Sequence, residues 1–226
     1  MILTPSELSR RRFLRGATAT CAALYAPGVF AELLTRTPAQ VEGPFYPDRM
    51  PLDTDNDLLI LNDNITPAVG EVTHLTGKIL DANGQPIRNA LVEIWQTDNN
   101  GIYRHTQDRD QDERDENFQS YGRFSTDRAG NYYFRTIKPQ PYPGRTPHIH
   151  YKVTKGEDHL LTTQCYVRGH ELNARDGLLR AIRDEKQRES VLVDFAPIED
   201  SDTGELAANF DVVVGWTPED SHDHGH

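Results

Sequence analysis

Cysteine is scarce in this sequence of 226 residues, which contains only Cys21 and Cys165. A framework of several disulfides and a metal site rich in thiolates are therefore excluded. Basic residues are also few, with 24 Lys and Arg against 35 Asp and Glu, and the formal net charge is -11. Such a chain repels phosphates, which argues against nucleic acid and anionic membrane surfaces as partners. A small anionic substrate stays open, because a local pocket can oppose the overall charge.

The sequence also lacks a run of about 20 apolar residues that could cross a membrane. The uncharged run Gly16–Ala31 is too short for that and is interrupted by Pro27-Gly28. It follows the basic segment Ser9–Arg15, and this order is typical of a twin-arginine export signal. We predict that residues 1–31 are a signal peptide and that the protein is exported to the periplasm or the extracellular space, with no membrane anchor after export. An ordinary N-terminal helix with a basic start is the alternative.

Short apolar runs alternate with turn signals from residue 71 onward, which is the pattern of an all-β sandwich. Only the segment from Leu172 to about Arg188 has a helical pattern. The predicted fold class is all-β: a single-domain β-sandwich with an N-terminal arm and one or two short helices. The predicted strands are Leu75–Leu80, Ala90–Gln96, Tyr132–Ile137, His148–Val153, Leu161–Val167, Val191–Phe195 and Phe210–Val214.

The chain divides into four predicted parts. Residues 1–31 are the signal peptide, 32–70 the arm, 71–217 the sandwich domain and 218–226 a disordered, histidine-rich tail. The acidic run Asp108–Glu116 could hold a cation, but a solvated loop is the better interpretation.

The strongest local motif is Pro147-His148-Ile149-His150-Tyr151. Residues i and i+2 of a strand point to the same face, so His148 and His150 present two imidazoles side by side. Such pairs bind many metals. Two surface or core histidines without a metal remain the alternative on this motif alone.

Two tyrosines extend the candidate site. Tyr142 lies six residues before His148 in a proline-rich turn, and Tyr103 follows the strand that carries Trp95. A free phenol has a pKa near 10, so a tyrosinate at neutral pH needs a strongly acidic cation beside it. Ferric iron suits phenolate oxygen and imidazole nitrogen together, whereas zinc with two histidines would be expected to recruit a carboxylate or thiolate.

Many motifs in one order carry a resemblance to the intradiol ring-cleaving dioxygenases, especially the iron-bearing subunit of the protocatechuate 3,4-dioxygenases. The resemblance covers roughly residues 41–217. Its motifs are Leu91–Gln96, Gly101–His105, Asn117-Phe118, Gly122–Phe124, Thr126-Asp127, Tyr133–Pro139, His148–His150, Thr163–Tyr166 and Phe210–Val214.

The resemblance implies a non-haem Fe(III) site that acts on a catechol-type diol and O2. It assigns Tyr103, Tyr142, His148 and His150 as the metal ligands. Tyr142 would also leave the iron and take a proton from the substrate.

Two further residues are matched by the resemblance. Arg145 would steady the developing charge of the activated ring, and Gln164 would lie near the bound substrate. The loop between Tyr142 and His148 is shorter than is usual in the family, which puts the placement of Arg145 in doubt. The segment Gly43–Tyr46 could line the pocket or only pack the arm.

Other functions compete with this one. The segment Gly77–Glu93 also resembles non-catalytic, transthyretin-like or carboxypeptidase-regulatory-like binding modules, which have no need of the tyrosine and histidine set. A protein that only scavenges iron or catechols is a third hypothesis, and a hydrolytic zinc enzyme is a weaker one. The preferred catechol and the oligomeric state, including a homo-oligomer, stay open.

Overall fold

A computed structural model describes residues 34–51, 53–61, 66–108 and 110–215. The predicted signal peptide and the whole of the predicted histidine-rich tail lie outside these residues, so both stay predictions. No helix in the described part of the chain has the length and apolar character needed to cross a membrane.

The first of two sheets is organised around β1, Val72–Leu80. On one side β1 pairs antiparallel with β4, Asn131–Ile137. On the other side it pairs parallel with β9, Leu206–Asn209, and then in the same register with β10, Val212–Val213. The short strand β8, Ala196–Pro197, pairs with β9 at the edge.

The second sheet carries most of the residues of interest. Its strand order is β3-β2-β5-β6-β7. Its long strands β5 and β6 pair antiparallel over their whole length. The strands are β2 Leu91–Trp95, β3 Tyr121–Ser125, β5 His148–Lys155, β6 Asp158–Val167 and β7 Leu192–Val193.

The hydrophobic core lies between the two sheets. Phe134 from the first sheet and Tyr151 from the second are fully buried in it, together with Phe210. The prediction of an all-β, single-domain sandwich is confirmed. Three strands were not predicted: β3, β8 and β9.

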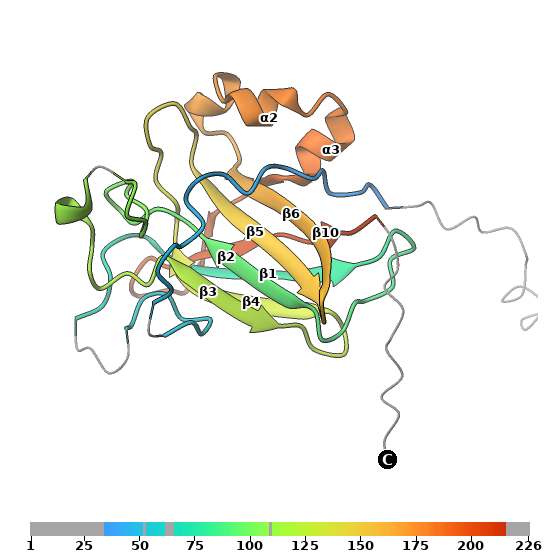
Figure 1. Cartoon of the computed structure of the whole chain (residues 1–226), viewed down its shortest axis with the longest axis horizontal. Helices are drawn as coiled ribbons and strands as arrows, with labels where there is room; N and C mark the ends of the chain where they lie inside the picture. The colour runs from blue at the N-terminus through green and yellow to red at the C-terminus, as the bar shows by residue number, and fades with distance from the viewer. Residues whose placement is uncertain (1–33, 52, 62–65, 109, 216–226) are drawn as a thin grey trace, which may run out of the picture. The chain divides into compact units, whose positions relative to one another are not determined.

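The second sheet is buried on its outer face as well. Glu93 and Trp95 of β2 point away from the core, yet only 8% and 0% of their surfaces are exposed. The arm covers them. It runs across β6 and β5 (blue in Figure 1), where Gln40 N–H donates to the carbonyl of Thr162 at 2.8 Å and Thr163 Oγ1 donates to the carbonyl of Pro38 at 2.8 Å.

The helical elements are short, and α2 and α3 lie together (Figure 1), where α3 contacts β7. The 3-10 turn η2 lies apart from them, in the loop that follows β2. The prediction of one or two short helices is confirmed, because the segment from Leu172 to about Arg188 contains most of α2 and α3, which Ile182 separates in an extended conformation. Asp176 and Asp184 cap the starts of α2 and α3 respectively. The elements are the 3-10 turns η2 Gln111–Glu113 and η3 Glu171–Ala174, α2 Gly177–Ala181 and α3 Glu185–Ser190.

Candidate metal centre

Three predicted ligands converge on the covered outer face of the second sheet. His148 and His150 point to the same side of β5, and their Nε2 atoms lie 3.2 Å apart. The hydroxyl oxygen of Tyr103 lies 3.2 Å from Nε2 of His148 and 3.1 Å from Nε2 of His150. All three side chains are at most 2% exposed.

The loop after β2 brings Tyr103 to the histidines. The buried carboxylate of Asp98 accepts the backbone N–H of Ile102 at 2.9 Å, and Asp108 accepts that of Tyr103 at 2.9 Å. Charged side chains inside the loop therefore replace the ladder bonds that a strand would provide. Asp108 belongs to the acidic run predicted to be solvated, and its carboxylate instead fixes the backbone of a candidate ligand.

Both imidazoles are neutral at pH 7. Nδ1 of His148 lies 2.6 Å from the carbonyl oxygen of Thr146, which can only accept, so Nδ1 carries the hydrogen and Nε2 keeps its lone pair. Burial lowers the pKa of His148 to about 3, and burial with the neighbouring His148 lowers that of His150 well below its usual range. A lone pair on neutral imidazole is the form that binds a metal.

The three atoms fit a bound cation. Two atoms that each lie about 2.1 Å from one ion are about 3.0 to 3.4 Å apart at octahedral or tetrahedral angles. The observed separations of 3.1 to 3.2 Å agree with this. In the described part of the chain no three His, Cys, Asp or Glu side chains form a metal-binding group, and the side-chain oxygen placed beside both imidazoles is the phenolic oxygen of Tyr103. Burial raises the pKa of Tyr103 well above 10, so a cation would have to displace its proton.

Tyr142 lies beside this group. Its ring centroid is 5.4 Å from that of Tyr103 and 5.7 Å from that of His148. Its hydroxyl oxygen accepts a long hydrogen bond of 3.4 Å from Nη1 of Arg145. Burial raises the pKa of Tyr142, and the guanidinium of Arg145 opposes that rise by favouring the phenolate.

Arg145 also reaches Gln164. Its Nη2 donates to Oε1 of Gln164 at 2.6 Å, while Nε2 of Gln164 donates to the carbonyl of Val41 in the arm at 3.2 Å. Oε1 also accepts from the hydroxyl of Tyr166 at 3.0 Å. The amide of Gln164 is thus held in one orientation. Hydrogen bonds and ring contacts join all six predicted site residues into a single cluster.

Aromatic rings enclose the cluster. Phe45 of the arm stacks on Tyr103 with ring centroids 4.8 Å apart and 14° between the planes, and meets the ring of Tyr142 edge-on at 5.8 Å. A Cβ at Gly43 would lie 3.4 Å from Cε1 of His150. Of the two interpretations of Gly43–Tyr46, the segment therefore lines the site.

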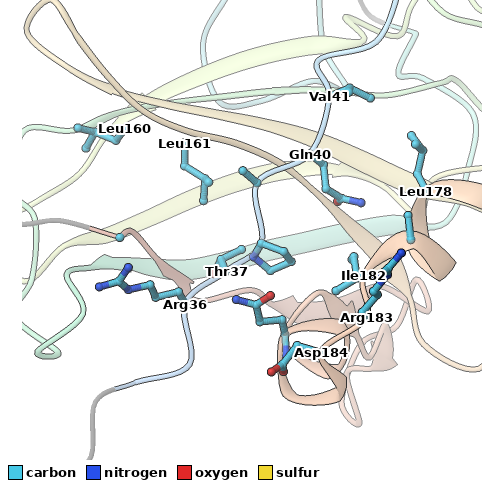
Figure 2. Close-up of a pocket in the computed structure, with 15 residues that line it drawn as sticks. Arg36, Thr37, Gln40, Val41, Leu160, Leu161, Leu178, Ile182, Arg183 and Asp184 are labelled. Atoms are coloured by element: carbon cyan, nitrogen blue, oxygen red, sulfur yellow. The ribbon is translucent and has the colours of Figure 1, made fainter.

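A separate groove of about 840 Å³ lies between the arm, β6 and α2 (Figure 2). Leu161 and Ile182 form part of its apolar wall, and none of the four candidate ligands lines it. Gln40 and Val41 of the arm line the groove (Figure 2). Both also form hydrogen bonds with Gln164 of the candidate site.

Two residues near the site were not predicted. Trp95 stacks on His150, and Asp176 holds Arg145 through a hydrogen bond of 2.8 Å to Nε. Asp176-Gly177 is a pattern that predicts a helix start, but it carries no signal for a partner 31 residues earlier.

The fold and the cluster together define a class: a β-sandwich protein whose candidate metal centre combines tyrosine and histidine side chains. A family model described as "Dioxygenase" matches residues 41–215. The chain belongs to this family, the intradiol ring-cleaving dioxygenases.

Individual relatives agree with this membership. Over 156 residues the chain is 36% identical to the protocatechuate 3,4-dioxygenase beta chain of Burkholderia cepacia, covering 65% of each protein. Over 151 residues it is 30% identical to a hydroxyquinol 1,2-dioxygenase of Corynebacterium glutamicum, covering 59% of this chain and 46% of that one. The chain thus spans less than two thirds of the length of these two relatives.

A solved structure has the same fold. It is the dioxygenase domain of a dioxygenase and carbohydrate-binding protein fusion from the cellulolytic bacterium Streptomyces sp. SirexAA-E. The two chains are 27% identical with a TM-score of 0.61, and the match covers 81% of this chain and all of the other.

Proposed function

We propose that this protein is a non-haem Fe(III) intradiol dioxygenase. It would insert both atoms of O2 into a catechol-type diol and cleave the ring between the two hydroxylated carbons, giving a cis,cis-muconate-type diacid. The observation that carries the proposal is the convergence of Tyr103 oxygen and the Nε2 atoms of His148 and His150 within 3.2 Å of one another. Relatives named for protocatechuate, hydroxyquinol and catechol support the substrate class.

Tyr103, Tyr142, His148 and His150 would hold the iron. Bound ferric iron would supply the Lewis acidity that favours phenolate and catecholate, and the electron-accepting capacity that makes the ring reactive toward O2.

The remaining steps belong to side chains of this chain. A catechol must lose two protons to act as a dianion, and the Tyr142 oxygen is the candidate acceptor for one of them. Arg145 lies next to that oxygen and adds a positive charge where negative charge develops. Phe45 of the arm covers the buried ring of Tyr103 and packs edge-on against Tyr142, which limits the access of water and strengthens these electrostatic interactions.

Oxygen consumption by the purified, iron-loaded protein tests the proposal. It should be measured against a panel of plain, carboxylated and hydroxylated catechols, with the ultraviolet spectrum of each product recorded. We expect a red-brown protein, from tyrosinate-to-iron charge transfer, that consumes one O2 per catechol and bleaches on reduction or chelation. A colourless protein that takes up no oxygen would contradict the proposal. Binding of catechol without oxygen uptake would indicate a scavenger instead.

We also propose export through the twin-arginine route, supported by the segment Ser9–Arg15 and the uncharged run after it. Replacing Arg11 and Arg12 together by lysine keeps the charge but removes the motif. The parent should then be found outside the cytoplasm and the variant inside it. Equal distribution of the two would contradict this route.

A further inference from the structure

Each carboxylate oxygen of Asp176, next to the site, accepts two hydrogen bonds. Its side chain is fully buried. Oδ2 accepts Nε of Arg145 at 2.8 Å and the backbone N–H of Thr146 at 3.0 Å, while Oδ1 accepts the backbone N–H groups of Leu178 and Leu179 at 3.0 and 2.9 Å. One oxygen therefore faces the candidate site and the other caps α2.

The contact with Arg145 fixes the direction of a planar group. The guanidinium donates through Nε to Asp176 and through Nη2 to Gln164 at 2.6 Å, and with these two points held Nη1 is left facing the hydroxyl of Tyr142. Without Asp176 a single short bond to Gln164 remains, and the guanidinium can turn away from Tyr142. Because Arg145 is a long and flexible side chain, this ordering has to come from its partners.

The contact with Thr146 reaches a second site residue. The N–H of Thr146 is held by Asp176, and its carbonyl oxygen lies 2.6 Å from Nδ1 of His148. The hydroxyl of Thr146 donates to Oδ1 of Asn173 at 2.6 Å. Asn173 and Asp176, which precede α2, therefore hold Thr146 in place. The Thr146 carbonyl in turn orients the ring of His148.

The short loop between Tyr142 and His148 explains why Arg145 and Thr146 need contacts with another segment to hold their positions. Only five residues separate Tyr142 from His148, and the turn between them closes on itself through Arg145 N–H donating to the carbonyl of Tyr142 at 3.0 Å. A Cβ at Gly144 in this turn would meet nothing within 4 Å, so the tip of the turn has little packing of its own.

We propose that Asp176 is a positioning residue that aims Arg145 at Tyr142 and Gln164 and holds the Thr146 carbonyl for His148. It acts through these residues and touches no reacting atom. The inference rests on the proposed function, since it assigns a task to Arg145 in that reaction.

Asp176→Asn separates this task from helix capping. The remaining Oδ1 can still cap α2, but the new amide group then turns its N–H donors toward Nε of Arg145 and N of Thr146, which are donors themselves. If the amide flips, the donors face Leu178 and Leu179 instead. Asp184→Asn is the matched control, because Asp184 caps α3 by accepting Gln187 N–H and, among the residues that the structure describes, forms no hydrogen bond or ion pair with a site residue.

The kinetic outcome is a split between kcat and KM. A misplaced catalytic group lowers kcat by about 10- to 100-fold, and the KM of the parent is largely retained. Asp184→Asn should keep both parental values. If Asp176→Asn fails to fold, Asp176→Ser replaces it, since serine is a good cap that is too short to reach Arg145. Parental kcat in the folded Asn or Ser variant would overturn the inference.

A double-mutant cycle shows whether Asp176 acts through Arg145. In an Arg145→Leu background, Asp176→Asn should lower kcat by a smaller factor than in the parent, because one of the two groups that it positions is already gone. An equal fold-loss in both backgrounds would mean a general structural role and would overturn the inference.

A crystal structure of Asp176→Asn tests the inference without an activity measurement, through the position of the Arg145 guanidinium. We expect the guanidinium to have left Tyr142, and an unmoved guanidinium would overturn the inference. If the parent takes up no oxygen with any catechol, the proposed function fails while this structural test still decides the positioning role.

Discussion

The indole of Trp95 lies flat on the imidazole of His150, with ring centroids 4.8 Å apart and 9° between the planes. The two residues are directly opposite each other in the antiparallel pairing of β2 and β5. Residues in such a pair share a face of the sheet, so the strand register places the Trp95 ring against the candidate ligand His150. The arm residue Tyr46 packs nearly perpendicular to the indole, with ring centroids 5.0 Å apart and 83° between the planes.

Trp95→Ala should destabilise the protein and weaken iron binding together. Removing a fully buried indole costs about 3 to 5 kcal/mol of unfolding free energy, and His150 loses the surface that restricts its rotation. Trp95→Phe should keep most of both properties, because it retains a stacking ring and because Nε1 of Trp95 has no hydrogen-bond partner among the described residues. Denaturant unfolding and iron titration check this. Full iron affinity in Trp95→Ala would show that the stack does not position His150.

Local patterns predicted part of this arrangement. The spacing of His148 and His150 on one strand follows from the period of two, and the structure places both on one face. Tyr103 and Tyr142 were candidates from the sequence, but their assignment as ligands came from the family resemblance, because each reaches the histidines from a loop whose path depends on tertiary hydrogen bonds. The contact of Asp176 with Arg145 joins residues 31 apart, and no periodicity carries such a signal.

The missed strands have physical reasons as well. β3 contains Gly122 and Arg123, which favour a turn or a surface position over a strand. Glycine is needed there because the arm passes close by: a Cβ at Gly122 would lie 2.7 Å from the carbonyl oxygen of Asp55. β9 contains two alanines and an asparagine, residues of low strand propensity, and pairing with β1 determines its conformation.

Tyr142→Phe should retain iron and lose most of the turnover. The ring stays packed against Tyr103 and His148, while the oxygen proposed to accept a substrate proton is removed. General acid–base groups of this kind contribute about 100-fold or more to kcat. Iron content and kcat of the two proteins, measured on the same preparation, check the prediction. Parental turnover would show that another group takes the proton.

His148→Ala should lose the metal. Its Nε2 is one of three atoms at the centre of the cluster, and alanine offers no replacement. The matched control is His159→Ala on β6, where an exposed imidazole forms a hydrogen bond with Oγ1 of Thr162 and lies outside the cluster. Elemental analysis after iron loading should find the control filled and His148→Ala nearly empty. Equal iron content in the two variants would contradict the ligand assignment.

Tyr46→Phe should change how stability depends on pH above 10. The Tyr46 hydroxyl donates to Oε1 of buried Glu93 at 2.9 Å, and burial with this carboxylate raises the pKa of Tyr46 to about 12. A phenol whose pKa is raised by folding stabilises the native state below its unfolded pKa near 10, and this stabilisation is lost as pH rises toward 12.

The difference in unfolding free energy between the parent and Tyr46→Phe should therefore be largest near neutral pH and shrink between pH 10 and 12. Denaturant unfolding of both proteins across this range measures it, and titration of the tyrosines that contact neither Tyr46 nor Glu93 cancels in the difference. Two stability curves that stay parallel up to pH 12 would show that the Tyr46–Glu93 bond does not hold the arm over the sheet. Because the same arm carries Phe45 over Tyr103, the curves also report how firmly the cluster is covered.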